Sequence, residues 1–188
     1  MRTPDGDNGE NVDLSLAANQ LFEDTEVVAG NGWTMDVIHT PGHLCDHVSF
    51  RLRERSLLFS GDHVMAWNTS VIAPPDGRMA DYLSSLQKLN EIEVDVFLPG
   101  HGGRVEQPRR TVKAFLLHRQ WREQAILDAL SGGCQTIDAV VGVVYEGLDE
   151  RLVRAASLSV QAHVEHLEER GRVSYSQPLA FDTPIGVV

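Results

Sequence analysis

The chain has 188 residues and a formal net charge of −11, with 16 Lys and Arg residues against 27 Asp and Glu residues. Hydrophobic residues make up 42% of it, enough for one domain with a buried core, alone or with a small appendage. No apolar run approaches the roughly 18 residues that span a bilayer, and MRTPDGDNGEN has no signal-peptide character, so we expect a cytoplasmic protein without a membrane partner. The acidic charge opposes attraction to nucleic-acid phosphates, and Cys45 and Cys134 are too few for a disulfide framework.

The first part of the chain has the texture of a strand-rich α/β domain. Residues 1–12 are polar and contain glycine and proline, which predicts a disordered leader. Apolar alternation then predicts a series of strands, followed by a change to a helical period at residues 79–90 and a further short strand at 94–99. The predicted strands before the helix are residues 26–30, 33–39, 47–53 and 56–60.

A long helix at about residues 110–130 closes this domain, which we place at residues 13–131, and SGGC ends the helix. Residues 132–188 then form a separate module, with helices in TIDAVVGVVY and LVRAASLSVQAHVEHLEERG and a short strand from Arg172 to Tyr175. Helix, helix and short strand are typical of a winged-helix unit. We favour a packing or dimerising role for it over a nucleic-acid contact, because the overall charge is acidic. The PLAFDTPIGVV tail carries no pattern that predicts an element.

Three candidate metal ligands lie in similar glycine-flanked turns, each just beyond an apolar run. They are His43 in HTPGH, Asp62 in FSGDH and His101 in LPGHGG. Imidazole nitrogen and carboxylate oxygen are ligands that zinc and similar divalent ions take. Glycine lets the backbone bend sharply beside each ligand, and Pro41 and Pro99 fix the chain just upstream. Each turn alone is a weak signal, but the three together predict a metal site.

These turns resemble the second half of the metallo-β-lactamase superfamily. TPGHLCDH, FSGDH and LPGHGG match its later motifs, and HRQWREQAIL with the winged-helix-like end resembles the subgroup of the lactamase-like protein 2 endoribonucleases, over roughly residues 26–175. The resemblance implies the C-terminal part of an αββα sandwich followed by a winged-helix-like module. It also implies a two-metal zinc site, with iron or manganese as alternatives, in which His43 lies on the first metal, Asp62 bridges and His101 lies on the second.

The family's first metal motif, His-x-His-x-Asp-His, lies upstream of the TPGH turn, but no histidine precedes His39 in this chain. Four ligands and the general-base aspartate are therefore missing, so we assign no catalytic base. We expect weak metal binding and impaired activity from this chain alone. A truncated gene product and a naturally shortened homologue both fit this pattern.

Other polar residues near the turns carry less weight. His39, His47 and His63 are expected to support the ligands through hydrogen bonds rather than to bind metal. Residues 65–79, with an exposed Trp67, form either a substrate-facing loop or a plain connection. We expect the remaining candidates to be structural: Cys45 as a buried thiol, His118 with Arg119 and Arg122 on a solvated helix face, and His163 with His166 as a solvent-exposed pair.

The sequence thus favours a metal-dependent hydrolase that attacks an ester, thioester, amide or phosphodiester of a small molecule or a nucleic acid, and a homo-oligomeric state. The alternatives are a non-catalytic half-fold, or a nucleic-acid-binding module that acts through the winged helix. In the second alternative the contacts come from Arg151, Arg154, Arg170 and Arg172, which are interleaved with Asp149, Glu150, Glu168 and Glu169.

Overall fold

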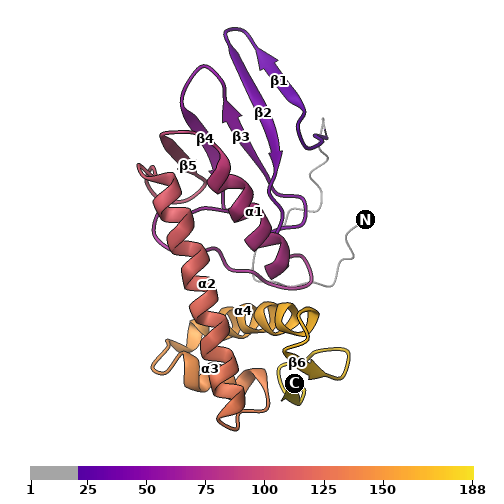
Figure 1. Cartoon of the computed structure of the whole chain (residues 1–188). Coiled ribbons are helices and arrows are strands. Elements are labelled where there is room, and N and C mark those ends of the chain that lie inside the picture. The colour runs from indigo at the N-terminus through magenta and orange to yellow at the C-terminus, as the bar shows by residue number, and fades with distance from the viewer. Residues whose placement is uncertain (1–20) are drawn as a thin grey trace.

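The computed structural model of the protein describes residues 21–188, so the predicted leader at residues 1–12 lies outside the described part. A sheet with α1 against it forms one layered unit, and the long helix α2 runs from this unit into a smaller group of elements around α3 and α4 (Figure 1). The elements in chain order are β1 Val27–Gly30, β2 Trp33–His39, β3 Val48–Leu52, β4 Leu57–Gly61, α1 Met79–Glu91, β5 Val96–Pro99, α2 Pro108–Ser131, α3 Ile137–Val144, α4 Glu150–Glu169, β6 Val173–Tyr175 and β7 Ile185–Val187.

Strands β1 to β5 form one sheet in sequence order. Neighbours from β1 to β4 are antiparallel, whereas β4 and β5 are parallel. Parallel neighbours need a crossover connection, and the segment between β4 and β5 supplies it with α1. The last residues of these two strands, Gly61 and Pro99, are register partners. The turns that follow, with Asp62 and His101, therefore leave the sheet side by side.

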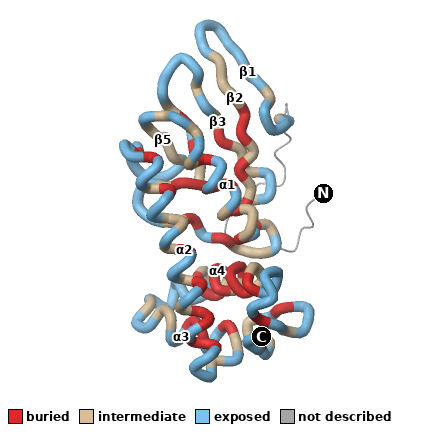
Figure 2. The backbone as a smooth tube through the Cα atoms, viewed as in Figure 1, coloured by how far each residue is buried: buried red, intermediate tan, exposed pale blue. Residues whose placement is uncertain are grey.

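The two faces of the sheet differ in how far they are covered. Leu58 and Phe97 are register partners on the face that packs against α1, and both are fully buried. On the opposite face, cross-strand pairing aligns Val37, Phe50 and Phe59 in one row. Phe59 keeps 37% of its surface exposed. Within the sheet unit, burial accordingly concentrates along α1 and the middle of the sheet, while β1 and the hairpin tips are open to solvent (Figure 2).

A second core lies in the C-terminal module. It is built from α3, α4 and the β6–β7 hairpin, and the last turns of α2 contribute Ile126, Leu127 and Leu130 to it. The tail for which the sequence predicted no element forms β7, which pairs antiparallel with β6. A three-residue strand that contains Gly186 is too short to show a period of two, which explains why its pattern was missed.

Helices α2 and α4 join the two units. Arg78, just before α1, forms an ion pair of 2.7 Å with Glu169 at the end of α4, and Ala162 of α4 belongs to the core beneath the sheet. No helix within residues 21–188 has the length and apolar character that crossing a bilayer requires.

Candidate metal centre

Asp62 and His101 lie together at the ends of β4 and β5. His101 Nε2 is 3.5 Å from Asp62 Oδ2, and 62% of the His101 side chain is exposed. Asp62 Oδ1 is buried and has no hydrogen-bond partner among the described residues. A Cβ atom at Gly100 would lie 2.6 Å from this oxygen. Any residue other than glycine would therefore clash with the carboxylate.

His43 is held by a turn that also demands glycine. Gly42 has φ +132°, and a Cβ atom there would lie 2.3 Å from the backbone of Tyr82. The His43 Nδ1–H donates to the carbonyl oxygen of Val71 at 2.7 Å. Because a carbonyl accepts only, the proton stays on Nδ1 and the Nε2 lone pair is left for a ligand. Sequence reasoning missed Val71, since a backbone carbonyl contact depends on where a loop passes and not on residue type.

His47 lies beside the same turns. Its Nδ1 is 2.8 Å from Thr40 Oγ1, and its ring packs over Gly61, where a Cβ atom would lie 2.5 Å from Nε2. Burial and the neighbouring His43 lower the pKa of His47, against a smaller opposing effect from Asp62. The His47 ring is thus favoured in its neutral form next to both candidate ligands.

His63 and His39 occupy different surroundings. The His63 ring is fully buried, with centroids 4.6 Å from Tyr82 and 5.7 Å from His47. Burial lowers the pKa of His63 to about 3, so this ring is neutral, and its nitrogens have no hydrogen-bond partner among residues 21–188. The His39 Nε2–H donates to the carbonyl of Cys45 at 3.1 Å, which ties the end of β2 to the TPGH turn.

These donors fit a metal ion in chemistry but not in number. The unpartnered carboxylate oxygen of Asp62, the neighbouring His101 imidazole and the oriented His43 ring are the donor types that zinc, iron and manganese accept. Within residues 21–188, however, no group of three or more His, Cys, Asp or Glu side chains is arranged to hold an ion. A complete site needs further donors, so the ligand set remains a prediction.

Three expectations about nearby polar residues are wrong. Cys45 is exposed, not buried, because it lies in the irregular connection between β2 and β3. Arg119 is 3% exposed and does not belong to a solvated face, because it lies on the inward stripe of α2. His163 and His166 are not a solvent-exposed pair: His163 is fully buried, and His166 Nδ1 bonds to the buried carboxylate of Glu123.

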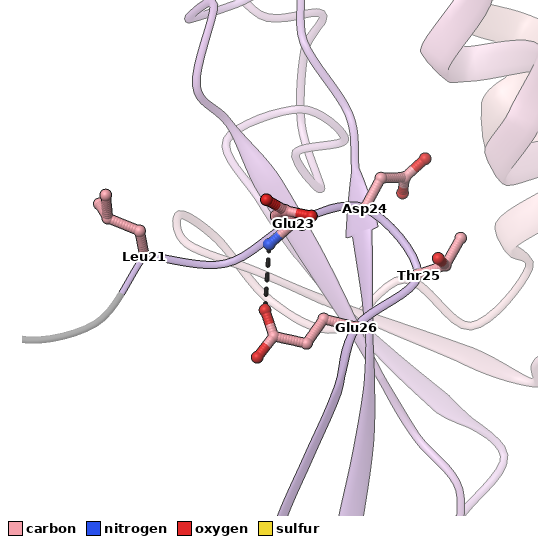
Figure 3. A pocket seen from close by; sticks show the side chains of 5 residues that line it. All are labelled: Leu21, Glu23, Asp24, Thr25 and Glu26. Carbon is pink, nitrogen blue, oxygen red and sulfur yellow. Dashed lines mark hydrogen bonds between the residues drawn. The ribbon is translucent and has the colours of Figure 1, made fainter.

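A hollow of about 500 Å³ near the start of β1 is lined by Leu21, Glu23, Asp24, Thr25 and Glu26 (Figure 3). Its carboxylates do not converge on one point in that view. Asp24 is engaged by Lys88 at 2.8 Å and by the backbone N–H of His39 at 2.8 Å. This hollow therefore offers no competing set of metal donors.

Comparison with known families identifies both parts of the chain. Residues 7–101 match the metallo-beta-lactamase superfamily, and residues 136–178 match the beta-lactamase associated winged helix domain. The first match covers half of the chain. The protein therefore belongs to the metallo-beta-lactamase superfamily, whose members include metal-binding hydrolases, and it carries the winged-helix module predicted from its sequence.

Individual relatives agree with this assignment. The beta-lactamase-like protein 2 homolog of Drosophila melanogaster is 36% identical over 166 residues, covering 86% of this chain and 53% of the relative. An atrochrysone carboxyl ACP thioesterase of Emericella nidulans is 29% identical, covering 83% of this chain and 51% of the relative. The crystal structure of a metallo-beta-lactamase family protein from Thermus thermophilus superposes with a TM-score of 0.77 at 26% identity, covering 89% of this chain and 54% of that one. The chain thus spans about half the length of these relatives.

Proposed function

We propose that the chain supplies part of the active site of a metal-dependent hydrolase, and that the bond attacked is an ester or thioester. Two relatives named as atrochrysone carboxyl ACP thioesterases, 31% and 29% identical to this chain, support this choice. His43, Asp62 and His101 would be its metal ligands. Zinc is the expected ion, with iron or manganese as alternatives, and further donors beyond residues 21–188 would complete the site.

The observation that carries the proposal is the buried, unpartnered oxygen of Asp62 beside His101. An acceptor oxygen removed from water without a hydrogen bond is unfavourable, and here this holds for Oδ1, while the side chain as a whole keeps 35% of its surface exposed. Arg119, a buried cation of the same domain, donates to Ser70 and Ser159, and neither contact reaches Asp62. A metal ion would supply the missing compensation.

Each of this chain's own groups has a definable part in the proposed reaction. A bound ion would lower the pKa of a coordinated water and stabilise the oxyanion that develops on the attacked carbonyl. Val71 fixes the His43 tautomer, which keeps its Nε2 lone pair free for ligation. The Ser70 hydroxyl donates to the backbone carbonyls of Asp62 and His63, and so holds the loop that carries the Asp62 carboxylate.

Zinc titration of the full chain and its variants tests the ligand set. We expect His43→Ala, Asp62→Ala and His101→Ala each to weaken zinc affinity by about tenfold or more, because each removes one donor from a small set. Cys45→Ala is the matched control: this exposed thiol sits in the same turn as His43 and should leave the affinity unchanged. The assignment would be contradicted if all three ligand variants bound zinc as tightly as the parent chain, or if only Cys45→Ala lost affinity.

A further inference from the structure

A second pocket, of about 320 Å³, lies where the sheet domain meets the winged-helix module. Three segments far apart in the sequence line it: the loop at residues 68–71, the middle of α2 and residues 145–159 around the start of α4. It is distinct from the metal turns, but its 68–71 loop includes Val71, whose carbonyl accepts from His43. The pocket is therefore built jointly by both modules.

Its lining is cationic in a protein whose formal charge is −11. Of the described residues, Arg119 and Arg122 line it together with Ser70, Ser159 and His118, and no Asp or Glu does. Burial and the two arginines lower the pKa of His118, which favours its neutral form. Leu148 and Leu152 add an apolar wall. Cations without acidic neighbours beside an apolar surface suit a ligand with one anionic end and an apolar body.

Arg119 gives this pocket its most specific feature. The side chain is 3% exposed, and its guanidinium lies 5.1 Å from the centroid of the Tyr82 ring. It donates to Ser70 O and, at 3.4 Å, to Ser159 Oγ, while its Nε has no hydrogen-bond partner in the described part of the chain. No carboxylate is among these contacts, although a buried cation ordinarily requires one. An oxyanion in the pocket would fill this role.

Arg122 adds a second, more accessible cation. Its guanidinium lies 4.0 Å from the centroid of the Tyr145 ring and makes a long contact of 3.4 Å to Val144 O. These contacts fix the side chain without using most of its five donors. Arg119 and Arg122, about one turn apart on α2, can thus both donate hydrogen bonds to one oxyanion.

The 68–71 loop connects the pocket to the metal turns. Ser70 O accepts from Arg119, and the next carbonyl, Val71 O, accepts from His43 Nδ1. The carbonyl that Arg119 contacts in the pocket, that of Ser70, therefore directly precedes the Val71 carbonyl that orients His43.

From these observations we infer that the pocket binds a phosphate or carboxylate group of the substrate, with Arg119 and Arg122 as its anchors and the apolar wall receiving the adjoining part of the molecule. This inference relies on the proposed function only in taking the bound molecule to be the substrate. It names the substrate class: a small ester or thioester that carries an anionic group close to the bond attacked.

Binding of simple anions to the full chain tests the pocket without any metal or turnover. Sodium phosphate and sodium benzoate are titrated separately by calorimetry at constant ionic strength, with benzamide as the uncharged match of benzoate. We expect saturable binding of at least one anion and none of benzamide. Arg122→Gln should weaken it about tenfold, because charge-assisted hydrogen bonds are lost. Arg110→Gln, an exposed arginine on the same helix outside the pocket, should change it less than about twofold.

The outcomes separate the two sources of the anion. Binding of phosphate alone indicates a phosphorylated substrate, and binding of benzoate alone indicates a carboxylate; both support the pocket. The inferred anion site is overturned by any of three results: neither anion binds saturably, benzamide binds as well as benzoate, or the Arg122→Gln variant binds like the parent chain. Because the assay needs no metal, its failure leaves the proposed metal ligands untouched, and failure of the zinc titration leaves the pocket untouched.

Discussion

At the scale of single residues, the candidate metal centre depends on close approaches that only glycine permits. Gly42, Gly61 and Gly100 each lie where an added Cβ would meet a neighbouring atom at 2.3 to 2.6 Å, at Tyr82, His47 and Asp62 respectively. The sequence predicted these turns and their three candidate donors from residue type and spacing. It did not predict the Val71 contact or the tilted ring contact of His63 with Tyr82, because both come from segments brought together only by the fold.

Gly100→Ala tests whether this packing matters for the metal. The new methyl group would displace the Asp62 carboxylate, and we expect zinc affinity to fall about tenfold, as for the loss of a group that orients a ligand. Gly103→Ala in the same turn is the control, because a Cβ there meets nothing within 4 Å. Zinc titration of both variants measures the difference. Equal affinities would mean that the Asp62 position does not limit binding.

At the scale of elements, the sequence predicted the helices and nearly all the strands, but it misjudged some polar residues on the helices. Arg119 and Glu123 share the inward stripe of α2 with Val112 and Ile126, and His163 shares that of α4 with Val160. Their helical spacing relative to the apolar residues predicts burial. Their residue type predicts exposure, because charged side chains ordinarily lie in solvent.

The buried His163 predicts a specific pH dependence. Its Nδ1 is 3.6 Å from Glu123 Oε1, and His166 and Arg119 are the other titratable groups that act on it. Burial lowers the pKa of His163 from 6.5 to about 4. The unfolded chain therefore takes up this proton at higher pH than the folded chain, and stability is lost as pH falls from about 6.5 to about 4.

The loss from this one group is on the order of 3 kcal/mol in the free energy of unfolding. Urea unfolding at a series of pH values measures it, and His163→Gln should flatten the slope between pH 6.5 and 4. A variant with the same slope as the parent chain would show that another group causes the acid sensitivity.

Helix α2 predicts what happens when the winged-helix module is removed. Deleting residues 132–188 would expose Ile126, Leu127 and Leu130 at the end of α2, which now pack into the C-terminal core. We expect the shortened chain to aggregate or to lose solubility. Gel filtration and light scattering check this, and a soluble, monomeric product would mean that the sheet domain folds without the module.

At the scale of the whole molecule, we propose that the chain self-associates through the face of the sheet opposite α1. Val37, Phe50 and Phe59 align there; Val37 is buried and the Phe22 ring packs edge-on against Phe50, so Phe59, which is 37% exposed, is the accessible side chain of the row. We expect Phe59→Glu to reduce the self-association constant by about tenfold or more, because a charge cannot be buried in such a contact without a partner. Sedimentation equilibrium measures it, with Val71→Glu as an exposed apolar control away from this row. A parent chain that is monomeric at all concentrations would contradict the proposal.

The central claim is that this chain holds part of a metal-dependent hydrolase site and that residues 21–188 do not complete it. The most direct measurement is the metal content of the purified 188-residue chain after dialysis, by mass spectrometry, together with its chelator-sensitive hydrolysis of a generic thioester. We expect less than one tightly held ion per chain and feeble turnover, because a two-metal site needs more donors than these residues bring together. Two tightly bound ions per chain with robust hydrolysis that a chelator abolishes would contradict this account.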